Sequence, residues 1–186
     1  MGRDKAQLPV GQRTLIEAVL QRLRPTVDRL VVIGHPNHVE AFRFLPSVEE
    51  ILVDAEPGQG PLMGVYTGLI HTRTSLNLFV PCDMPWIAGE LIRRLVQVSL
   101  QGAEVVGSLH PVEGIQPFPL VCHRKVCRTV RELLNQKQRP VQELLRLPRA
   151  RLVRIEEPGL WRSFTNINTV SDYAELCNET AFASGS

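Results

Sequence analysis

Apolar residues recur along the chain with two spacings, one typical of helices and one typical of buried strands. From Thr14 onward they follow at helical spacing as far as Val27, which predicts an amphipathic helix whose last turn is disturbed by Pro25. The continuous aliphatic run 30–33, closed by Gly34, instead predicts a strand that is covered on both faces. The chain therefore starts as an alternation of helix and strand.

The same alternation continues through the rest of the sequence. Further strands are expected at 51–53, 76–80, 120–122 and 152–155, and further helices at 65–71, 91–98, 124–134, 140–145 and from Ser171 onward. Short, nearly continuous apolar strands that alternate with helices indicate an α/β domain built on a single doubly wound, mostly parallel sheet. We expect this domain to span 1–178, with 179–186 as a tail.

Composition and charge exclude several classes of protein. The 186 residues are 44% hydrophobic and 22% charged, which is ordinary for a globular protein with a buried core. Because 21 basic residues are offset by 19 acidic ones, with no long tract of like charge, nucleic acid is not the implied partner.

No apolar run approaches the ~18 residues needed to cross a bilayer, so we expect a soluble, cytoplasmic protein without a membrane partner. The four cysteines lack zinc-ligand spacing and are expected to be reduced thiols.

Two predicted strands end in a carboxylate. Asp54 follows the run 51–53, and Asp83 follows the apolar run that begins at Leu76. Ligands of open α/β sheets bind beyond the carboxyl ends of the strands, where a carboxylate is well placed to hold a divalent cation. Mg²⁺ is usually held by one or two carboxylates together with substrate phosphates. Alternatively, each Asp caps the following helix or turns the chain.

The surroundings of Asp83 favour a binding role over a capping role. Pro81 and Pro85 restrict the backbone on either side of it, and rigid framing of a short carboxylate is typical of a metal site. Between the two carboxylates lies a loop, 56–64, whose glycines permit positive φ and close approach to a ligand. Such loops are also common on protein surfaces, so the loop by itself is a weak signal.

Two other polar features have both a chemical and a plain interpretation. A lysine in a loop between strand and helix can neutralise triphosphate charge during nucleotidyl transfer, but Lys5 taken alone is interpreted as a solvated residue near the start of the chain. His35 and His38 are separated by Pro36 and have no third ligand nearby in the sequence. We therefore expect both histidines in a solvent-facing loop and not at a metal.

Five short motifs occur in a fixed order across nearly the whole chain. They are Met-Gly-Arg-Asp-Lys-Ala at 1–6, Pro-Gly-x-Gly-Pro-Leu-x-Gly within 54–64, Pro-Cys-Asp-Met-Pro at 81–85, Gln-Pro at 116–117 and Phe-Thr-Asn-Ile-Asn-Thr at 164–169. Together they resemble the molybdenum cofactor guanylyltransferases, the MobA-like nucleotidyltransferase family. The Cys-Asp-Met-Pro form distinguishes the chain from sugar-nucleotide and isoprenoid cytidylyltransferases, which share the fold but carry other residues around that Asp.

The resemblance implies a reaction and its participants. The expected activity is the transfer of GMP from GTP to the phosphate of molybdopterin cofactor, which forms the guanine dinucleotide form of the cofactor and releases pyrophosphate. Mg²⁺ is the implied metal cofactor, GTP and molybdopterin cofactor are the implied substrates, and molybdoenzymes or their chaperones are possible partners.

The resemblance also implies a role for each residue that matches a family motif. Lys5 is expected to contact the GTP phosphates, and Asp83 to bind both the nucleotide and Mg²⁺, which makes these two the expected catalytic pair. Nucleotide binding is expected to involve Asp54, Gly58 and Gly60 as well. The candidates for the pterin side of the site are Gln116, Arg139, Asn166 and Asn168.

The sequence departs from the family at its start. In the family, a strand and a glycine-rich loop precede the Met-Gly-x-Asp-Lys segment, whereas this sequence begins at Met1. We therefore expect a Rossmann-like nucleotidyltransferase fold that lacks its central first strand and phosphate loop, with a natural protein that begins roughly 15 to 20 residues earlier. Two alternatives stay open: a cytidylyltransferase acting on the same cofactor, and a non-catalytic truncated paralogue that binds the cofactor or a partner.

Overall fold

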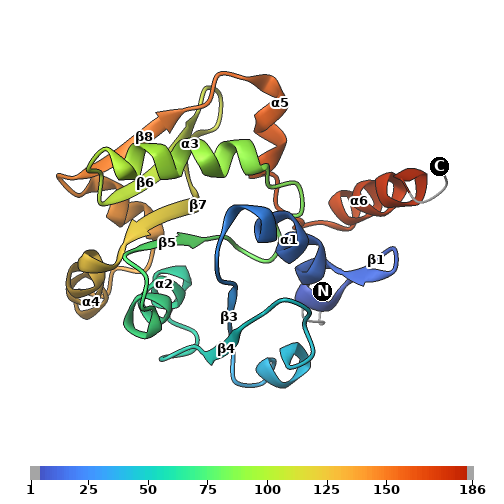
Figure 1. The fold of residues 1–186 in the computed structure, drawn as a ribbon, viewed down its shortest axis with the longest axis horizontal. Helices are drawn as coiled ribbons and strands as arrows, with labels where there is room; N and C mark the ends of the chain where they lie inside the picture. Colours follow the sequence, from blue (N-terminus) through green and yellow to red (C-terminus); the bar gives the residue numbers. More distant parts are fainter. Residues whose placement is uncertain (1–4, 184–186) are drawn as a thin grey trace.

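The computed structural model describes residues 5–183 and confirms the α/β class (Figure 1). The strands are β1 (Pro9–Val10), β2 (Arg13–Thr14), β3 (Val31–Gly34), β4 (Glu50–Val53), β5 (Leu76–Phe79), β6 (Val105–His110), β7 (Gly114–His123) and β8 (Ala150–Arg154). The α-helices are α1 (Leu15–Leu23), α2 (Pro61–His71), α3 (Gly89–Leu100), α4 (Cys127–Asn135), α5 (Pro158–Trp161) and α6 (Val170–Ala183). Short 3₁₀ helices occur at Lys5–Gln7, Arg24–Thr26, Val39–Phe42, Arg124–Val126, Val141–Arg146 and Arg162–Phe164.

The main sheet is mixed, whereas the sequence predicted a mostly parallel one. Its strand order is β5-β7-β6-β8, in which β7 runs antiparallel to both of its neighbours and β6 pairs parallel with β8. The reason lies in the connection from β6 to β7, which is only residues 111–113, since a parallel pair needs a crossover of a dozen residues or more. Gly114, at φ +79°, begins the returning strand.

Among the described residues, β3 and β4 form a parallel pair separate from the main sheet. The expected single sheet is thus divided between β3 and β5. β1 and β2, which the sequence did not predict, form a small antiparallel hairpin ahead of α1.

The start and end of α1 follow from local chemistry. The backbone N–H and hydroxyl of Thr14 both donate to Glu17 Oε2, at 2.6 and 2.8 Å, in a capping box. The helix ends at Leu23, and Pro25 lies in the 3₁₀ turn that follows, as its ring and missing N–H lead one to expect.

α2 begins four residues earlier than the sequence predicted. Gly60, with φ +84°, precedes the helix, and Pro61 occupies its first position. Proline fits there because the first helical N–H has no partner within the helix. Residues 61–64, expected in a loop, therefore belong to the first turn of a buried helix. α6 runs across residue 178, and the domain limits inferred from the sequence stay a prediction.

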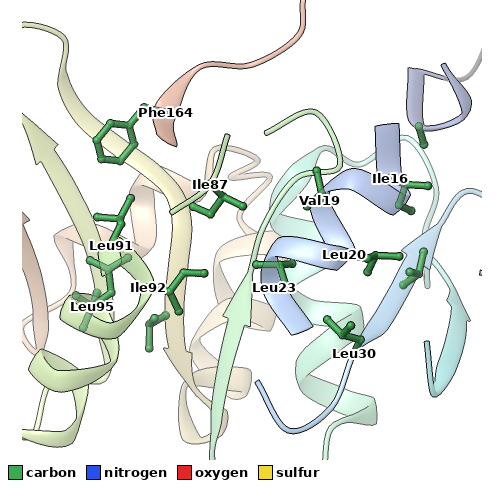
Figure 2. Packing of buried hydrophobic residues seen from close by; sticks show 14 of the residues in the cluster. Ile16, Val19, Leu20, Leu23, Leu30, Ile87, Leu91, Ile92, Leu95 and Phe164 are labelled. Atoms are coloured by element: carbon green, nitrogen blue, oxygen red, sulfur yellow. The ribbon is translucent and has the colours of Figure 1, made fainter. Parts of the chain in front are cut away.

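Helices cover both faces of the main sheet. α3 lies over one face, where Leu91 and Leu95 are fully buried, and Figure 2 shows them in the same apolar cluster as Leu20 and Leu23 of α1. The opposite face carries α2 and α4, with a second cluster that includes Leu120 of β7. None of the helices in the described part of the chain is long and apolar enough to cross a membrane.

A cavity of about 810 Å³ lies along the division between β3 and β5. It is lined by Val31–Gly34 and by Leu76–Phe79, together with residues of α1 and α2. Within residues 5–183, β3 pairs with β4 alone and β5 with β7 alone, so each presents an unpaired edge toward this space (Figure 1). The cavity therefore separates the β3–β4 pair from the main sheet.

Candidate functional site

Asp83 lies in the segment that leaves β5, beyond the carboxyl end of the strand, as predicted. Its backbone carbonyl accepts a hydrogen bond from the Ile167 N–H at 2.9 Å, which joins this segment to the loop before α6. Burial raises the pKa of the Asp83 carboxyl above its usual value, and the positive charge of Lys5 opposes that rise. Asp83 is therefore a partly desolvated carboxylate that a cation would stabilise.

Lys5 reaches the same corner from the start of the chain. Its Nζ donates to Asn168 Oδ1 at 3.0 Å, and its backbone carbonyl accepts from the Leu8 N–H at 3.1 Å. Ala6, the next residue, is 2% exposed and fixes this turn in the core. Lys5 is thus held in place, unlike a freely solvated residue, although the preceding motif residues 1–4 lie outside the described residues.

The loop before α6 holds Asn168 in position. Ile167 is buried in a small cluster with Trp86, while Asn166 and Asn168 are exposed on either side of it. The backbone N–H groups of Asn168 and Thr169 both donate to one carboxylate oxygen of Asp172, at 2.9 and 2.8 Å.

Asp54 is placed at the end of β4 by a residue that the sequence did not single out. Thr67, fully buried in α2, donates its hydroxyl to Asp54 Oδ1 at 2.8 Å and accepts the Ala55 N–H at 3.0 Å. The Asp54 N–H in turn donates to the carbonyl of Gly34 at 2.9 Å. A polar residue inside the apolar segment 61–71 was the available signal for Thr67, but its partner is 13 residues away in the sequence.

The glycine-rich loop after Asp54 has the open backbone that the sequence predicted. Gly58 and Gly60 have φ of +81° and +84°, and no atom lies within 4 Å of where a Cβ would stand on Gly58. The loop is tied to α4 by an ion pair between Glu56 and Arg131 at 2.9 Å. Arg139 comes close to Gly60, whose Cβ position would lie 3.5 Å from the arginine Cβ.

The cavity between β3 and β5 connects these two groups of residues. Asp54 and Gly60 line it, as do Ala6 and Cys82, the immediate neighbours of Lys5 and Asp83. Lys5 and Asp83 themselves stand just outside its lining.

One predicted residue, Gln116, falls outside this arrangement, whereas His35 and His38 line the cavity. Gln116 lies on β7, where its Nε2 donates to Glu113 Oε2 at 3.2 Å, next to the β6–β7 turn. His35 and His38 face each other with ring centroids 5.7 Å apart, in the loop after β3. Among residues 5–183, no three His, Cys, Asp or Glu side chains are grouped to hold a metal on their own.

The chain is similar to proteins that are already known. Residues 1–154 match the family model described as the MobA-like NTP transferase domain. The molybdenum cofactor guanylyltransferase of Serratia proteamaculans is 30% identical over 172 residues, which cover 92% of this chain and 84% of that protein.

Two solved structures share the fold. Molybdopterin-guanine dinucleotide biosynthesis protein A of Archaeoglobus fulgidus superposes with a TM-score of 0.75 at 20% identity, covering 97% of this chain and 92% of its own. A Mycobacterium tuberculosis protein in complex with manganese gives a TM-score of 0.68 at 21% identity, covering 95% and 93% of the two chains.

Proposed function

The chain belongs to the MobA-like NTP transferase family, and on this premise we propose that it transfers GMP from GTP to the phosphate of molybdopterin cofactor. The products are the guanine dinucleotide form of the cofactor and pyrophosphate. The observation that carries the proposal is that Lys5, Asp83 and Asn168, from three distant motifs, are joined by hydrogen bonds of one loop, next to residues that line the same cavity as Asp54.

The residues at this corner fit a divalent metal held jointly with a nucleotide. Asp83 supplies one partly buried carboxylate whose pKa is raised by desolvation, so a bound cation would offset the cost of its charge. A single carboxylate that acts with substrate phosphates suits Mg²⁺, which keeps several of its waters and rarely uses an all-protein cage. When bound, the metal would neutralise charge on the phosphate undergoing substitution.

The chain's own residues would orient the nucleotide and stabilise the leaving group. Asp54, fixed by Thr67, and the open backbone at Gly58 and Gly60 would hold the nucleotide along the loop. The ammonium of Lys5 would stabilise the negative charge that builds on the departing pyrophosphate. Arg139 lies with its Cβ beside Gly60 and donates its guanidinium to the carbonyl of Leu134 at 3.2 Å. It remains a candidate for the pterin side, as do Gln116, Asn166 and Asn168.

The guanine nucleotide is favoured over the cytosine nucleotide by the names of the curated relatives. The cytidylyltransferase alternative predicts a cytosine dinucleotide product, and the non-catalytic alternative predicts no product. Incubation of the protein with molybdopterin cofactor, Mg²⁺ and either GTP or CTP separates all three, because the two transferases form different dinucleotides and a non-catalytic protein forms none.

The decisive variant is Asp83→Asn, which keeps the shape of the side chain and removes its charge. We expect the rate of GMP transfer, measured as the rate of pyrophosphate release, to fall by on the order of 100-fold or more. The reason is that the carboxylate is a ligand and not a packing group. Glu132→Gln, the same chemical change at an exposed residue of α4, is the matched control and should retain full activity. Transfer by Asp83→Asn at the wild-type rate would contradict the assignment of this site.

A further inference from the structure

Asp172 binds the loop before α6 more extensively than a helix cap requires. It is the third residue of α6, and it forms a reciprocal capping box with Thr169, whose hydroxyl accepts the Asp172 N–H at 3.1 Å. The same carboxylate oxygen also accepts the N–H of Asn168, one residue before the cap. These two amides hold the pKa of the Asp172 carboxyl below its usual value.

The additional bond connects Asp172 to the proposed catalytic lysine. The Asn168 side chain accepts from Lys5 Nζ, and the positive charge of Lys5 also acts on the Asp172 carboxylate. The links form a short chain: the carboxylate fixes the Asn168 backbone, and Asn168 fixes the lysine. The preceding residue of the same loop, Ile167, donates its N–H to the Asp83 carbonyl at 2.9 Å, which brings the lysine to the side of Asp83. None of these contacts joins Asp172 to the nucleotide loop at Gly58–Gly60.

We propose that Asp172 is a positioning residue for the transfer reaction, which fixes Asn168 so that its side chain holds Lys5 beside Asp83. The inference rests on the proposed function in so far as it concerns the rate of transfer. It makes a separate claim about where Lys5 is held in the protein without substrate.

Other contacts keep α6 attached when this carboxylate is lost. Trp86 donates its indole N–H to Glu179 at 3.0 Å, Arg162 pairs with Glu175 at 2.7 Å, and Leu176 is buried against the core. The Tyr173 hydroxyl also donates to the carbonyl of Pro9. Removal of the Asp172 carboxylate should therefore loosen the loop locally and leave the helix docked.

The chain offers a matched control for the loss of a capping carboxylate. Glu17 is the third residue of α1 and accepts two hydrogen bonds from Thr14, so it has the same place in a capping box as Asp172. Glu17→Ala and Asp172→Ala should lower the melting temperature by similar amounts. Only the second change disturbs the position of Lys5.

The first test measures transfer kinetics. Asp172→Ala should lower kcat by on the order of tenfold or more, with a smaller change in KM for GTP, because a displaced lysine loses contact mainly with the charge of the transition state. Asp172→Asn should restore most of the rate, since an Asn oxygen also accepts backbone N–H groups, and Glu17→Ala should remain within about twofold of wild type. The double variant Lys5→Ala/Asp172→Ala should be no slower than Lys5→Ala alone.

The second test does not depend on the reaction. Acylation of the Lys5 amine, followed by mass spectrometry with exposed Lys137 as the internal reference, should be faster in Asp172→Ala than in wild type and unchanged in Glu17→Ala. A wild-type protein without transfer activity would overturn the proposed function but leave this readout intact. Asp172→Ala that matches Glu17→Ala in both kinetics and labelling would overturn the positioning role.

Discussion

The two sides of the molecule are packed by different means. On the closed side, α3 lies against the main sheet, and Leu91, Leu95 and Val106 have no exposed surface. On the open side, the β3–β4 pair and α1 border the cavity, so Leu20 and Val32 have empty space on one side. Apolar patterning forms helices and strands equally well on both sides, but close packing requires that neighbouring strands also pair. The proposed site lies at the end of the open side.

The largest expected contrast between the two sides is in the cost of deleting a leucine side chain. Leu95→Ala should lower the free energy of unfolding by about 2 to 5 kcal/mol, since the change opens a new void in a closed core. Leu20→Ala should cost about 2 kcal/mol or less, because the side chain already borders a cavity. Urea denaturation of both variants gives the two values, and equal costs would show that the cavity wall is packed as tightly as the α3 face.

Enlarging a side chain should reverse the contrast. Val106→Leu adds a methylene where β6 is fully buried, and overpacking there should cost about 1 to 3 kcal/mol. Val32→Leu adds the same group beside the cavity, where the result should lie between no change and a gain of about 0.8 kcal/mol. The same denaturation experiment measures both, and a substantial loss for Val32→Leu would mean that the space is closed in solution.

The closed side was also the easier part to predict from the sequence. Helix α3 and parts of β7 and β8 follow from apolar spacing, because residues near in sequence decide their local structure. The direction of β7 depends on a connection of three residues, 111–113, and the apolar pattern predicted only the strand residues 120–122 beyond it. The start of α2 was missed because proline and glycine were interpreted as a loop, whereas Gly60 and Pro61 form a helix start.

The sequence predicted candidate residues for the site, but it did not predict the hydrogen bonds that hold them. Asp54 and Asp83 were found because strand ends collect ligands in this class of fold. The bond between Thr67 and Asp54, and the chain from Asp172 to Lys5, join positions 13 and 167 residues apart, and no local pattern encodes such pairs. These contacts arise only when the helices have docked.

Thr67→Val tests whether the Thr67 hydroxyl, on the open side, orients Asp54 for nucleotide binding. The change keeps the shape of the side chain but removes the hydroxyl that bridges Asp54 and Ala55, at a cost of roughly 1 to 2 kcal/mol. Under the proposed function, KM for GTP should rise severalfold because Asp54 loses its orientation. Thr26→Val removes a single hydroxyl bond to the carbonyl of Leu23 and should leave KM unchanged. An unchanged KM in Thr67→Val would show that Thr67 has no role in nucleotide binding.

The smallest expected effect is the contribution of the Asp83 carboxylate to the stability of the folded protein. Because burial raises its pKa above the usual 3.8, the folded protein holds this proton more tightly than the unfolded chain does. The contribution of Asp83 to stability therefore decreases as pH rises from below 3.8 through the raised pKa, and it stays unfavourable at neutral pH.

Asp83→Asn removes this unfavourable charge, so the variant that loses transfer should melt at a slightly higher temperature than wild type at pH 7. The difference should vanish in acid, where both side chains are neutral, and it should grow in a Lys5→Ala background, because the lysine opposes the rise in the carboxyl pKa. Thermal unfolding of the four proteins across pH measures all three effects. A lower melting temperature for Asp83→Asn at neutral pH would show that the carboxylate is already stabilised in the free protein, and would remove the reason for a cation to bind there.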